Sequence, residues 1–150
     1  MQGLQSRSGV ADDTEAIFEV MVRAFNVEEN SDWWRRWHEM AVRDAERFRV
    51  LEVEGKVVGV AIINPERLCV GSCEIVKADV GEVSVLPEFQ GKGYGSALMR
   101  DVVQWMRDNG CDMSRLGGSA IFYRRFGYGP FPRRSVVFPI EPVQAGAATL

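Results

Sequence analysis

The sequence predicts one domain of α/β (α+β) class, and three observations lead to this prediction. The stretch from Gly81 to Met99 has the pattern of a strand, a glycine-rich loop and a helix. Two apolar runs on either side of Glu54-Gly55 indicate a hairpin before it. A short apolar run that ends at Gly117-Gly118 indicates another strand after it. At 150 residues the chain is long enough to bury a core without disulfides or metals.

The remaining elements follow from local patterns, and two places in the chain are ambiguous. Asn64-Pro65-Glu66 is expected to break the second hairpin strand, and Leu68 to Ile75 could hold a short extra strand. Trp33 and Trp37 recur at helical spacing with Met40 or Ala41 and are interpreted as core, whereas Trp34 points elsewhere. The expected elements are strands at 4–7, 49–53, 56–63, 76–85, a short buried strand at 113–116 and a last strand at 135–140, with helices at about 12–25, 33–47, 93–108 and 119–126.

Composition excludes several classes of function. A net charge of −3 argues against nucleic acid as a partner, and no apolar run approaches the length of a membrane span. The N-terminus has no apolar signal core, so we expect a cytoplasmic protein. Cys69, Cys73 and Cys111 lack metal-ligand spacing with the single His38, so we expect no metal and interpret the three cysteines as packing residues.

The glycine-rich loop has the clearest chemistry in the sequence. Gly91, Gly93 and Gly95 stand at alternate positions, where a missing Cβ lets the backbone approach a ligand. The first turn of the following helix offers unpaired N–H groups, so the loop predicts an anion site suited to a diphosphate. An NTPase phosphate loop would end in Gly-Lys-Ser/Thr, but Lys92 lies between the first two glycines.

A dinucleotide-binding fingerprint is the less well matched alternative for the same loop. It would require glycine at Ser96 and would begin directly after the strand, whereas residues 87–90 intervene. The distance in sequence from the glycine loop to Asp112 is compatible with the acidic residue that binds the ribose hydroxyl in such a fingerprint. This alternative therefore stays open and predicts NAD binding.

Two motifs in order resemble those of one known family. The pattern Val-x-Val-x-Pro-x-x-Gln-Gly-x-Gly-x-Gly at 83–95 resembles the acetyl-coenzyme A motif of the GNAT acetyltransferase superfamily. The segment Tyr123-Arg124-Arg125-Phe126-Gly127-Tyr128 is similar to that family's Tyr-x-x-x-Gly-aromatic signature. Residues 118–130 are most similar to the N-terminal acetyltransferase domain of the enhanced intracellular survival proteins.

The resemblance covers nearly the whole chain and implies a fold. It implies a mixed, mostly antiparallel sheet flanked by about four helices. The strand at 76–85 and the strand at 113–116 would be parallel neighbours that splay apart and form the cofactor cleft. Residues 1–140 would form a single acetyltransferase domain, and 141–150 a flexible tail.

The resemblance also implies an activity and a set of binding residues. It implies an acetyl-coenzyme A-dependent N-acetyltransferase that acts directly on a small-molecule or peptide amine in a ternary complex. A homodimer is the assembly considered for the chain. The alternative is a non-catalytic acyl-coenzyme A-binding or sensor module. For a transferase, the tryptophan stripe has an alternative interpretation to core packing, as a wall of the acceptor pocket. The implied cofactor-binding residues are Val83, Ser84, Val85, Gln90, Gly91, Lys92, Gly93, Tyr94, Gly95, Ser96 and Ser119.

The implied catalytic residues are one acid and one base. Tyr123 matches the family tyrosine that protonates the departing thiolate. Asp79 falls where several family members present a base, and Glu82 is on the opposite face of the strand unless a bulge intervenes. Water is the other candidate base. Leu116 replaces an Asn that often contacts the cofactor in this family, which leaves backbone or Ser119 for that contact.

Overall fold

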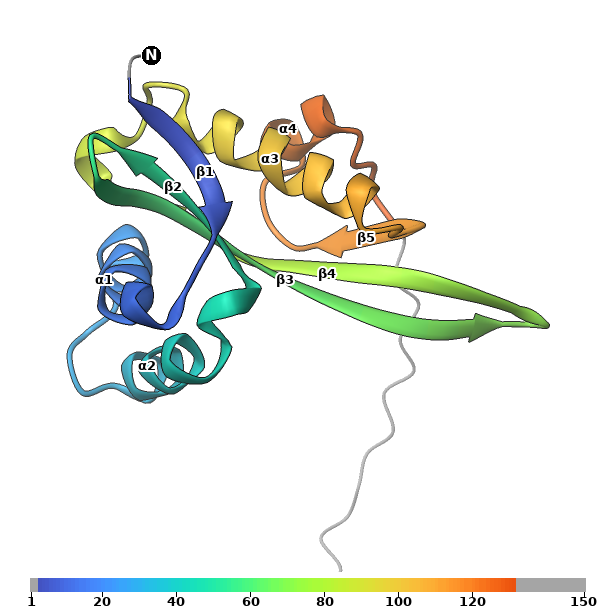
Figure 1. Cartoon of the computed structure of the whole chain (residues 1–150), viewed down its shortest axis with the longest axis horizontal. Helices are drawn as coiled ribbons and strands as arrows, with labels where there is room; N and C mark the ends of the chain where they lie inside the picture. The colour runs from blue at the N-terminus through green and yellow to red at the C-terminus, as the bar shows by residue number, and fades with distance from the viewer. Residues whose placement is uncertain (1–2, 132–150) are drawn as a thin grey trace, which may run out of the picture.

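A five-stranded mixed sheet forms the centre of the molecule, with the strands in the order β1-β2-β3-β4-β5 (Figure 1). The structure is a computed structural model and describes residues 3–131, so the expected strand at 135–140 and the tail at 141–150 lie outside the described residues. All neighbouring strands are antiparallel except β4 and β5, which are parallel. The predicted fold class is therefore confirmed. The strands are β1 Leu4–Ser8, β2 Phe48–Val53, β3 Lys56–Val70, β4 Cys73–Val85 and β5 Met113–Leu116.

Four α-helices flank the described sheet, with α1 and α2 on one face and α3 and α4 on the other (Figure 1). They are α1 Thr14–Phe25, α2 Asp32–Asp44, α3 Tyr94–Asp108 and α4 Ala120–Tyr123. Helix α1 buries Ile17, Val20 and Met21 at helical spacing. Helix α2 begins after Ser31, whose side chain accepts a hydrogen bond from the Trp34 N–H at 3.2 Å. The aliphatic face of α3 completes the core from the other side.

Strand β3 is longer than expected, because Pro65 does not break it. The pairing of β2 with β3 ends at Ile62, so Pro65 lies on a free edge while it pairs with Ala78 of β4 on the other side. A proline is tolerated on an edge, because its missing N–H removes no ladder bond there. The expected break at Asn64-Pro65-Glu66 is therefore wrong, and β4 begins at Cys73 rather than Val76.

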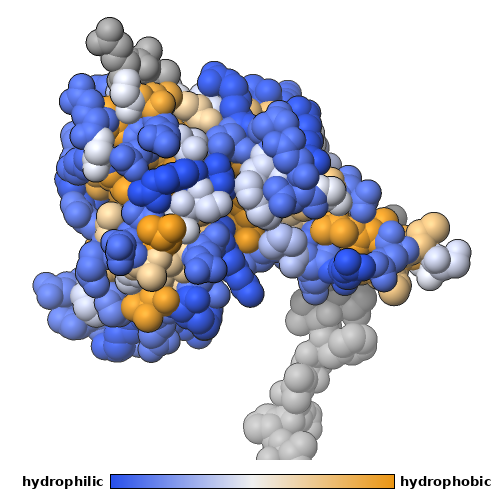
Figure 2. All heavy atoms as spheres, viewed as in Figure 1, coloured by the Kyte–Doolittle hydropathy of each residue, from blue (hydrophilic) through white to orange (hydrophobic). Residues whose placement is uncertain are grey.

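The outer parts of β3 and β4 form a two-stranded hairpin that projects from the body (Figure 1). Val70 is an exposed apolar residue near its tip, and apolar surface is visible at this end of the molecule in Figure 2. Cys69 and Cys73 are also exposed here, so their interpretation as packing residues is wrong. Cys111, which is half-buried against the core, is a packing residue.

Two further expectations are corrected by burial. Strand β5 has no buried residue, although a buried strand was expected, because only β4 pairs with it among the described residues. In the tryptophan stripe, Trp37 and Ala41 are core residues but Trp33 is exposed. Trp34 packs edge-on against Phe18 with a centroid distance of 5.0 Å.

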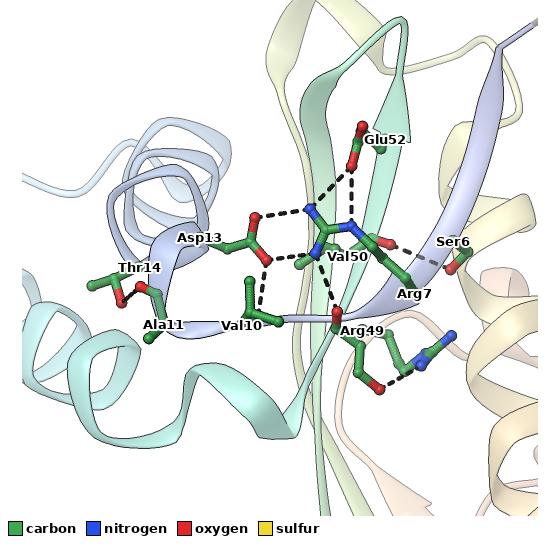
Figure 3. Close-up of polar contacts among 10 residues, drawn as sticks. Ser6, Arg7, Val10, Ala11, Asp13, Thr14, Arg49, Val50 and Glu52 are labelled. Carbon is green, nitrogen blue, oxygen red and sulfur yellow. Dashed lines mark hydrogen bonds and ion pairs between the residues drawn. The ribbon is translucent and has the colours of Figure 1, made fainter.

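An ion-pair network fastens β1 to its neighbours (Figure 3). The Arg7 guanidinium donates to both Asp13 oxygens, at 2.6 and 2.9 Å, and through Nε to Glu52 at 3.1 Å. Asp13 also accepts from the Val10 N–H at 2.9 Å. Because Arg7 lies on β1, Asp13 precedes α1 and Glu52 lies on β2, the network joins three elements.

A second ion pair joins the sheet to α3. Arg49 on β2 donates to both oxygens of Asp101, with Nε–Oδ2 at 2.7 Å and Nη2–Oδ1 at 3.0 Å. The Arg49 side chain is 12% exposed and that of Asp101 23%. A bidentate pair with this burial orients α3 on the sheet more effectively than a solvent-exposed pair would.

Among residues 3–131, none of the helices combines the length and the apolar content needed to cross a membrane. Within the same range, no group of three or more His, Cys, Asp or Glu side chains has the arrangement of a metal site.

Candidate active site

A β-bulge in β4 changes which side chains face which side of the sheet. Val60 of β3 pairs with Ser84 and Ile62 pairs with Gly81, so Glu82 and Val83 together stand opposite Ala61. Glu82 has a positive φ of 48°, which is the left-handed conformation typical of such an insertion. The extra residue reverses the alternation beyond it. Asp79 and Val85 therefore lie on opposite faces, whereas uninterrupted alternation would place them on the same one.

Strands β4 and β5 separate just before this point. Their parallel pairing ends at Val80 and Leu116, but β4 continues to Val85. The segment of β4 from Gly81 to Val85 therefore has no β5 partner on that side. Backbone amides at such a place are free to bond an extended ligand as an added strand would.

The glycine loop turns from β4 into α3 through two left-handed residues. Gly91 has a φ of 71° and Gly93 a φ of 89°, and a Cβ added to either would meet no atom within 4 Å. The backbone thus requires glycine conformationally, and the space beside it is open. Ser96 and Ala97 are the first residues of α3 to donate hydrogen bonds, both to the Gly93 carbonyl. The N–H groups of the preceding first turn point outward without an intrahelical acceptor.

One cavity of about 260 Å³ brings the end of β4, the loop and the α4 segment together. Seven of the thirteen site residues predicted from the sequence line it, namely Val83, Ser84, Val85, Gln90, Gly95, Ser119 and Tyr123. Ala24, Phe25 and Phe122 complete the lining. The Gln90 side chain donates to the Val85 carbonyl at 2.9 Å and so holds the loop to the end of the strand.

Tyr123 is placed in this cavity by short-range contacts. The α4 turn is N-capped by Ser119, whose hydroxyl is 3.5 Å from the Phe122 N–H, and the following 3₁₀ turn ends at Gly127 with a φ of 93°. The Tyr123 ring lies against Gly118, where an added Cβ would be 2.8 Å from Cε2 of the ring. The backbone of Gly118 also has a φ of 131°. Only glycine at this position permits the observed ring placement.

The pKa of Tyr123 is raised above its ordinary value. Burial is the main cause, because it disfavours the phenolate, and the neighbouring Tyr128 adds to the effect. The Tyr128 hydroxyl is itself hydrogen-bonded to Ser114 at 2.8 Å. A raised pKa keeps Tyr123 protonated through neutral pH, which is the state that a proton donor requires.

Asp79 does not line the cavity and is engaged in ion pairs. It accepts from Lys77 at 3.0 Å and from two nitrogens of Arg115 on β5 at 2.9 and 3.1 Å. Burial raises the pKa of Asp79, but the hydrogen bonds and charges of the two cations together outweigh burial and hold that pKa below its usual value. A carboxylate in this state is a weak proton acceptor.

Glu82, at the bulge, does not line the cavity either, but it has the opposite electrostatic environment. It is half-buried, and desolvation raises the pKa of its carboxyl group. No ion pair to Glu82 is found among the described residues. Of the two carboxylates considered from the sequence, Glu82 is therefore the more basic.

The other predicted loop residues lie outside the cavity lining. Gly91, Gly93, Tyr94 and Ser96 belong to the turn and first helical residues beside it. The Lys92 ammonium donates to the Glu88 carbonyl at 2.7 Å and lies 5.8 Å from the centre of the Phe89 ring. It is thus turned back onto its own loop.

The family of the chain follows from comparison with known proteins. Residues 5–131 match the family described as Acetyltransferase (GNAT) domain. The chain belongs to the GNAT acetyltransferase family. The match extends across every described strand and helix except the first residue of β1.

Two relatives of this GNAT protein carry names that give the type of activity without a substrate. An uncharacterized N-acetyltransferase of Methanocaldococcus jannaschii is 28% identical over 137 residues, covering 81% of this chain and 59% of the relative. An uncharacterized N-acetyltransferase of Escherichia coli is 27% identical over 118 residues, covering 79% of this chain and 65% of the relative. The chain thus spans less than two thirds of the length of these relatives.

Solved structures of GNAT proteins have the same fold. A GNAT family acetyltransferase from Brucella melitensis in complex with acetyl-coenzyme A is 29% identical with a TM-score of 0.69, over 93% of this chain and 97% of that one. Eis1 from Mycobacterium abscessus is 26% identical with a TM-score of 0.67, over 84% of this chain and 31% of that one. These TM-scores do not single out the enhanced intracellular survival proteins as the nearest relatives.

Three residues of this GNAT site were not selected from the sequence. Arg125 lies with its Nη1 3.5 Å from the Ser96 hydroxyl and its guanidinium over Phe122, so it brings positive charge to the start of α3. Phe25 lines the cavity from the end of α1. Gly118 positions Tyr123. The second motif contains Arg125 and could have suggested its role, but no local pattern indicates that Phe25 lines a cavity together with residues of β4.

Proposed function

We propose that the protein is an acetyl-coenzyme A-dependent N-acetyltransferase that transfers an acetyl group directly to an amine in a ternary complex. The observation that carries this proposal is the cavity shared by Tyr123, by Val83 to Val85 and by Gln90 and Gly95 at the two ends of the glycine loop. Acetyl transfer needs these groups together, because the thioester, the amine and the proton donor must meet in one place. The membership of the GNAT family and the acetyl-coenzyme A-bound relative support the choice of co-substrate.

The chain's own features fit the proposed co-substrate. The open space beside Gly91 and Gly93 and the first turn of α3 suit a diphosphate. Arg125 would add a charged contact there. The unpaired part of β4 from Gly81 to Val85 suits the amides of a pantetheine arm, which would extend along it as a strand does. Lys92, turned onto its own loop, is not assigned a phosphate contact.

The proposed chemistry needs one proton donor and one proton acceptor. Attack by the neutral amine forms the new C–N bond and breaks the C–S bond, after which the thiolate takes a proton from the Tyr123 hydroxyl. The amine nitrogen loses its extra proton to water, which would pass it to Glu82, because Glu82 adjoins Val83 in sequence but does not line the cavity. The raised pKa of Glu82 supports this assignment, and the ion pairs of Asp79 argue for a structural role at that residue.

The first experiment tests cofactor identity. We expect acetyl-coenzyme A, and not NAD, to raise the melting temperature of the protein and to bind in calorimetry. Gly93→Val should abolish that binding, because its side chain would occupy the open space of the loop and strain a φ of 89°. Gly71→Val is the matched control, since Gly71 has a φ of 63° in the β3–β4 turn, is equally open and lies at the tip of the projecting hairpin. Normal affinity of Gly93→Val, or binding of NAD alone, would overturn the loop assignment.

The second experiment tests turnover. Release of free thiol from acetyl-coenzyme A in the presence of a panel of amines is expected only if the protein is a transferase. Tight binding without thiol release would instead support a sensor module. On an accepted amine, Glu82→Gln should lower kcat more than Asp79→Asn does, and it should weaken the rise of the rate with pH on the acidic side. Equal rates for Glu82→Gln and wild type would assign proton removal to water.

A further inference from the structure

The cavity that contains Tyr123 is continuous with an aromatic surface on α1 and α2. We call this surface the aromatic ledge and define it as Phe25, Trp33 and Trp37. Phe25 lines the cavity. Its ring centroid is 5.2 Å from that of Trp37, which in turn is 6.1 Å from that of Trp33. The ledge thus extends from the proposed proton donor toward the start of α2.

Two members of the ledge, Phe25 and Trp33, are exposed, and the third, Trp37, is buried behind Phe25. Phe25 is 50% exposed and Trp33 59%, whereas Trp37 is only 7% exposed. Trp37 therefore backs the Phe25 ring from the core. Single exposed apolar residues are common on protein surfaces, but Phe25 leaves half its surface in water at the wall of the one cavity that holds the site.

The position of Phe25 is set by the end of α1. Asn26 follows in the left-handed conformation with a φ of 52°, and the Val27 N–H bonds back to the Val22 carbonyl at 3.0 Å. These contacts stop the helix directly after Phe25. The ring is therefore held at the cavity by backbone geometry and by Trp37, so it is preorganised to contact a ligand.

The lining of the cavity contains no charged side chain. Its polar groups are the hydroxyls of Ser84, Ser119 and Tyr123 and the amide of Gln90. Of these, Gln90 is bonded to the Val85 carbonyl and Ser84 to the Glu82 carbonyl at 3.0 Å. Ser84, Gln90 and Ser119 are also expected to hold the co-substrate, so few polar groups remain for the acceptor. The unpaired polar groups of a polyhydroxylated or polycationic acceptor would therefore oppose binding.

We propose that the acceptor is a primary amine that carries a bulky apolar group, aryl or branched alkyl, and that this group binds against the aromatic ledge. The amine would then reach the thioester beside Tyr123. This inference rests on the proposed N-acetyltransferase activity and adds the substrate class. Phe25 is the residue that would determine specificity, because it is the member of the ledge that also lines the cavity.

The test compares two amines of similar length that differ in polarity, phenethylamine and histamine. With acetyl-coenzyme A saturating, kcat/KM from thiol release should favour phenethylamine by about tenfold to a hundredfold. Phe25→Ala should lower kcat/KM for phenethylamine by about tenfold or more, chiefly through KM, and bring the ratio of the two amines toward one. Phe25→Leu, which keeps apolar bulk, should retain an intermediate preference and guards against a folding defect of the alanine variant.

Val42→Ala is the matched control, because Val42 is an exposed apolar residue of α2 outside the cavity. It should leave the ratio of the two amines unchanged. Calorimetry of phenethylamine with the protein–coenzyme A complex adds a readout that does not depend on turnover. If thiol is released and histamine is used as well as phenethylamine or better, the proposed substrate class is wrong and the proposed activity stands. If phenethylamine binds in a way that depends on Phe25 but no amine releases thiol, the proposed activity is wrong and the aromatic ledge stands as a binding site.

Discussion

The body of the sheet and the segment that carries Tyr123 are built by different means. In the body, side chains of α1, β2, β3 and α3 form one buried core that includes Ile17, Phe48, Val60 and Leu98. Ion pairs of Arg7 and Arg49 connect its elements. The segment from β5 through α4 and the following 3₁₀ turn has no buried residue at all.

The proposed acid is only partly buried against the core, and local features of its own segment set its position. A serine N-cap, a glycine under the ring and a left-handed glycine at the end of the turn define where Tyr123 lies. Aromatic contacts with Phe122 at 4.9 Å and Tyr128 at 6.1 Å complete its surroundings. Changes in this segment should therefore affect activity more than stability, and changes in the body should do the reverse.

The largest effect is expected from Tyr123→Phe. This change removes the proton donor and keeps the ring, so kcat on an accepted amine should fall by a factor of about 10²–10⁴. Acetyl-coenzyme A affinity from calorimetry and the urea midpoint should change little, since the ring contacts persist. Because the pKa of Tyr123 is raised, the wild-type rate should not decline as the pH rises toward the ordinary tyrosine pKa of about 10. Full turnover by Tyr123→Phe would make Tyr123 a packing residue.

Gly118→Ala is expected to act almost as strongly, although it leaves the Tyr123 hydroxyl in the protein. Its Cβ would be 2.8 Å from Cε2 of Tyr123, so the ring must move. A misplacement of about 1 Å can cost up to about 10²-fold in rate, and we expect a loss of about 10- to 10²-fold in kcat. Gly117→Ala is the matched control, because a Cβ there meets no atom within 4 Å. If both variants lose the same activity, ring placement by Gly118 is not the cause.

In the body, Asp101→Ala should reverse the pattern. It leaves Arg49 without its partner at a largely buried place, so the free energy of unfolding from urea denaturation should fall by about 1–3 kcal/mol. The kcat of the folded protein should be unchanged. Glu74→Ala provides the comparison, because it breaks the exposed pair with Arg67 on the projecting hairpin and should cost less than about 0.5 kcal/mol. An equal cost for both variants would contradict the view that Arg49 and Asp101 hold α3 on the sheet.

The smallest effect concerns the pH dependence of the body. The hydrogen bond from Arg7 is the main cause that lowers the pKa of Asp13, against an opposing contribution of burial. A carboxyl group whose pKa is lower in the folded state stabilises the protein above its unfolded pKa of about 3.9, and that contribution is lost as the pH falls through the folded value. The urea midpoint of the wild type should therefore exceed that of Asp13→Asn at pH 7, and the difference should shrink below about pH 4. A difference that is independent of pH would assign the effect to packing.

Much of the fold could be predicted from the sequence, because its signals are local. The apolar spacing of α1 and α3, the glycine loop and the order of the strands depend on residues within a few positions of one another. The same holds for Gly127, whose left-handed conformation closes the turn that follows Tyr123. Seven of the predicted site residues meet in one cavity for this reason, since two compact motifs supply them.

What only the tertiary structure decided depends on pairing between distant residues. Pro65 lies within a strand because β2 has already ended opposite it, and Glu82 bulges because two residues of β4 face one residue of β3. The ion pair of Asp79 with Arg115 joins residues 36 positions apart, and Phe25 and Val83 line one cavity only because α1 lies against β4. Periodicity and capping depend on residues that are close in sequence, so the sequence by itself determined the helices and strands. Strand register, burial and the partner of a charged side chain depend on residues that are distant in sequence, so the tertiary structure decided which side chains share the site.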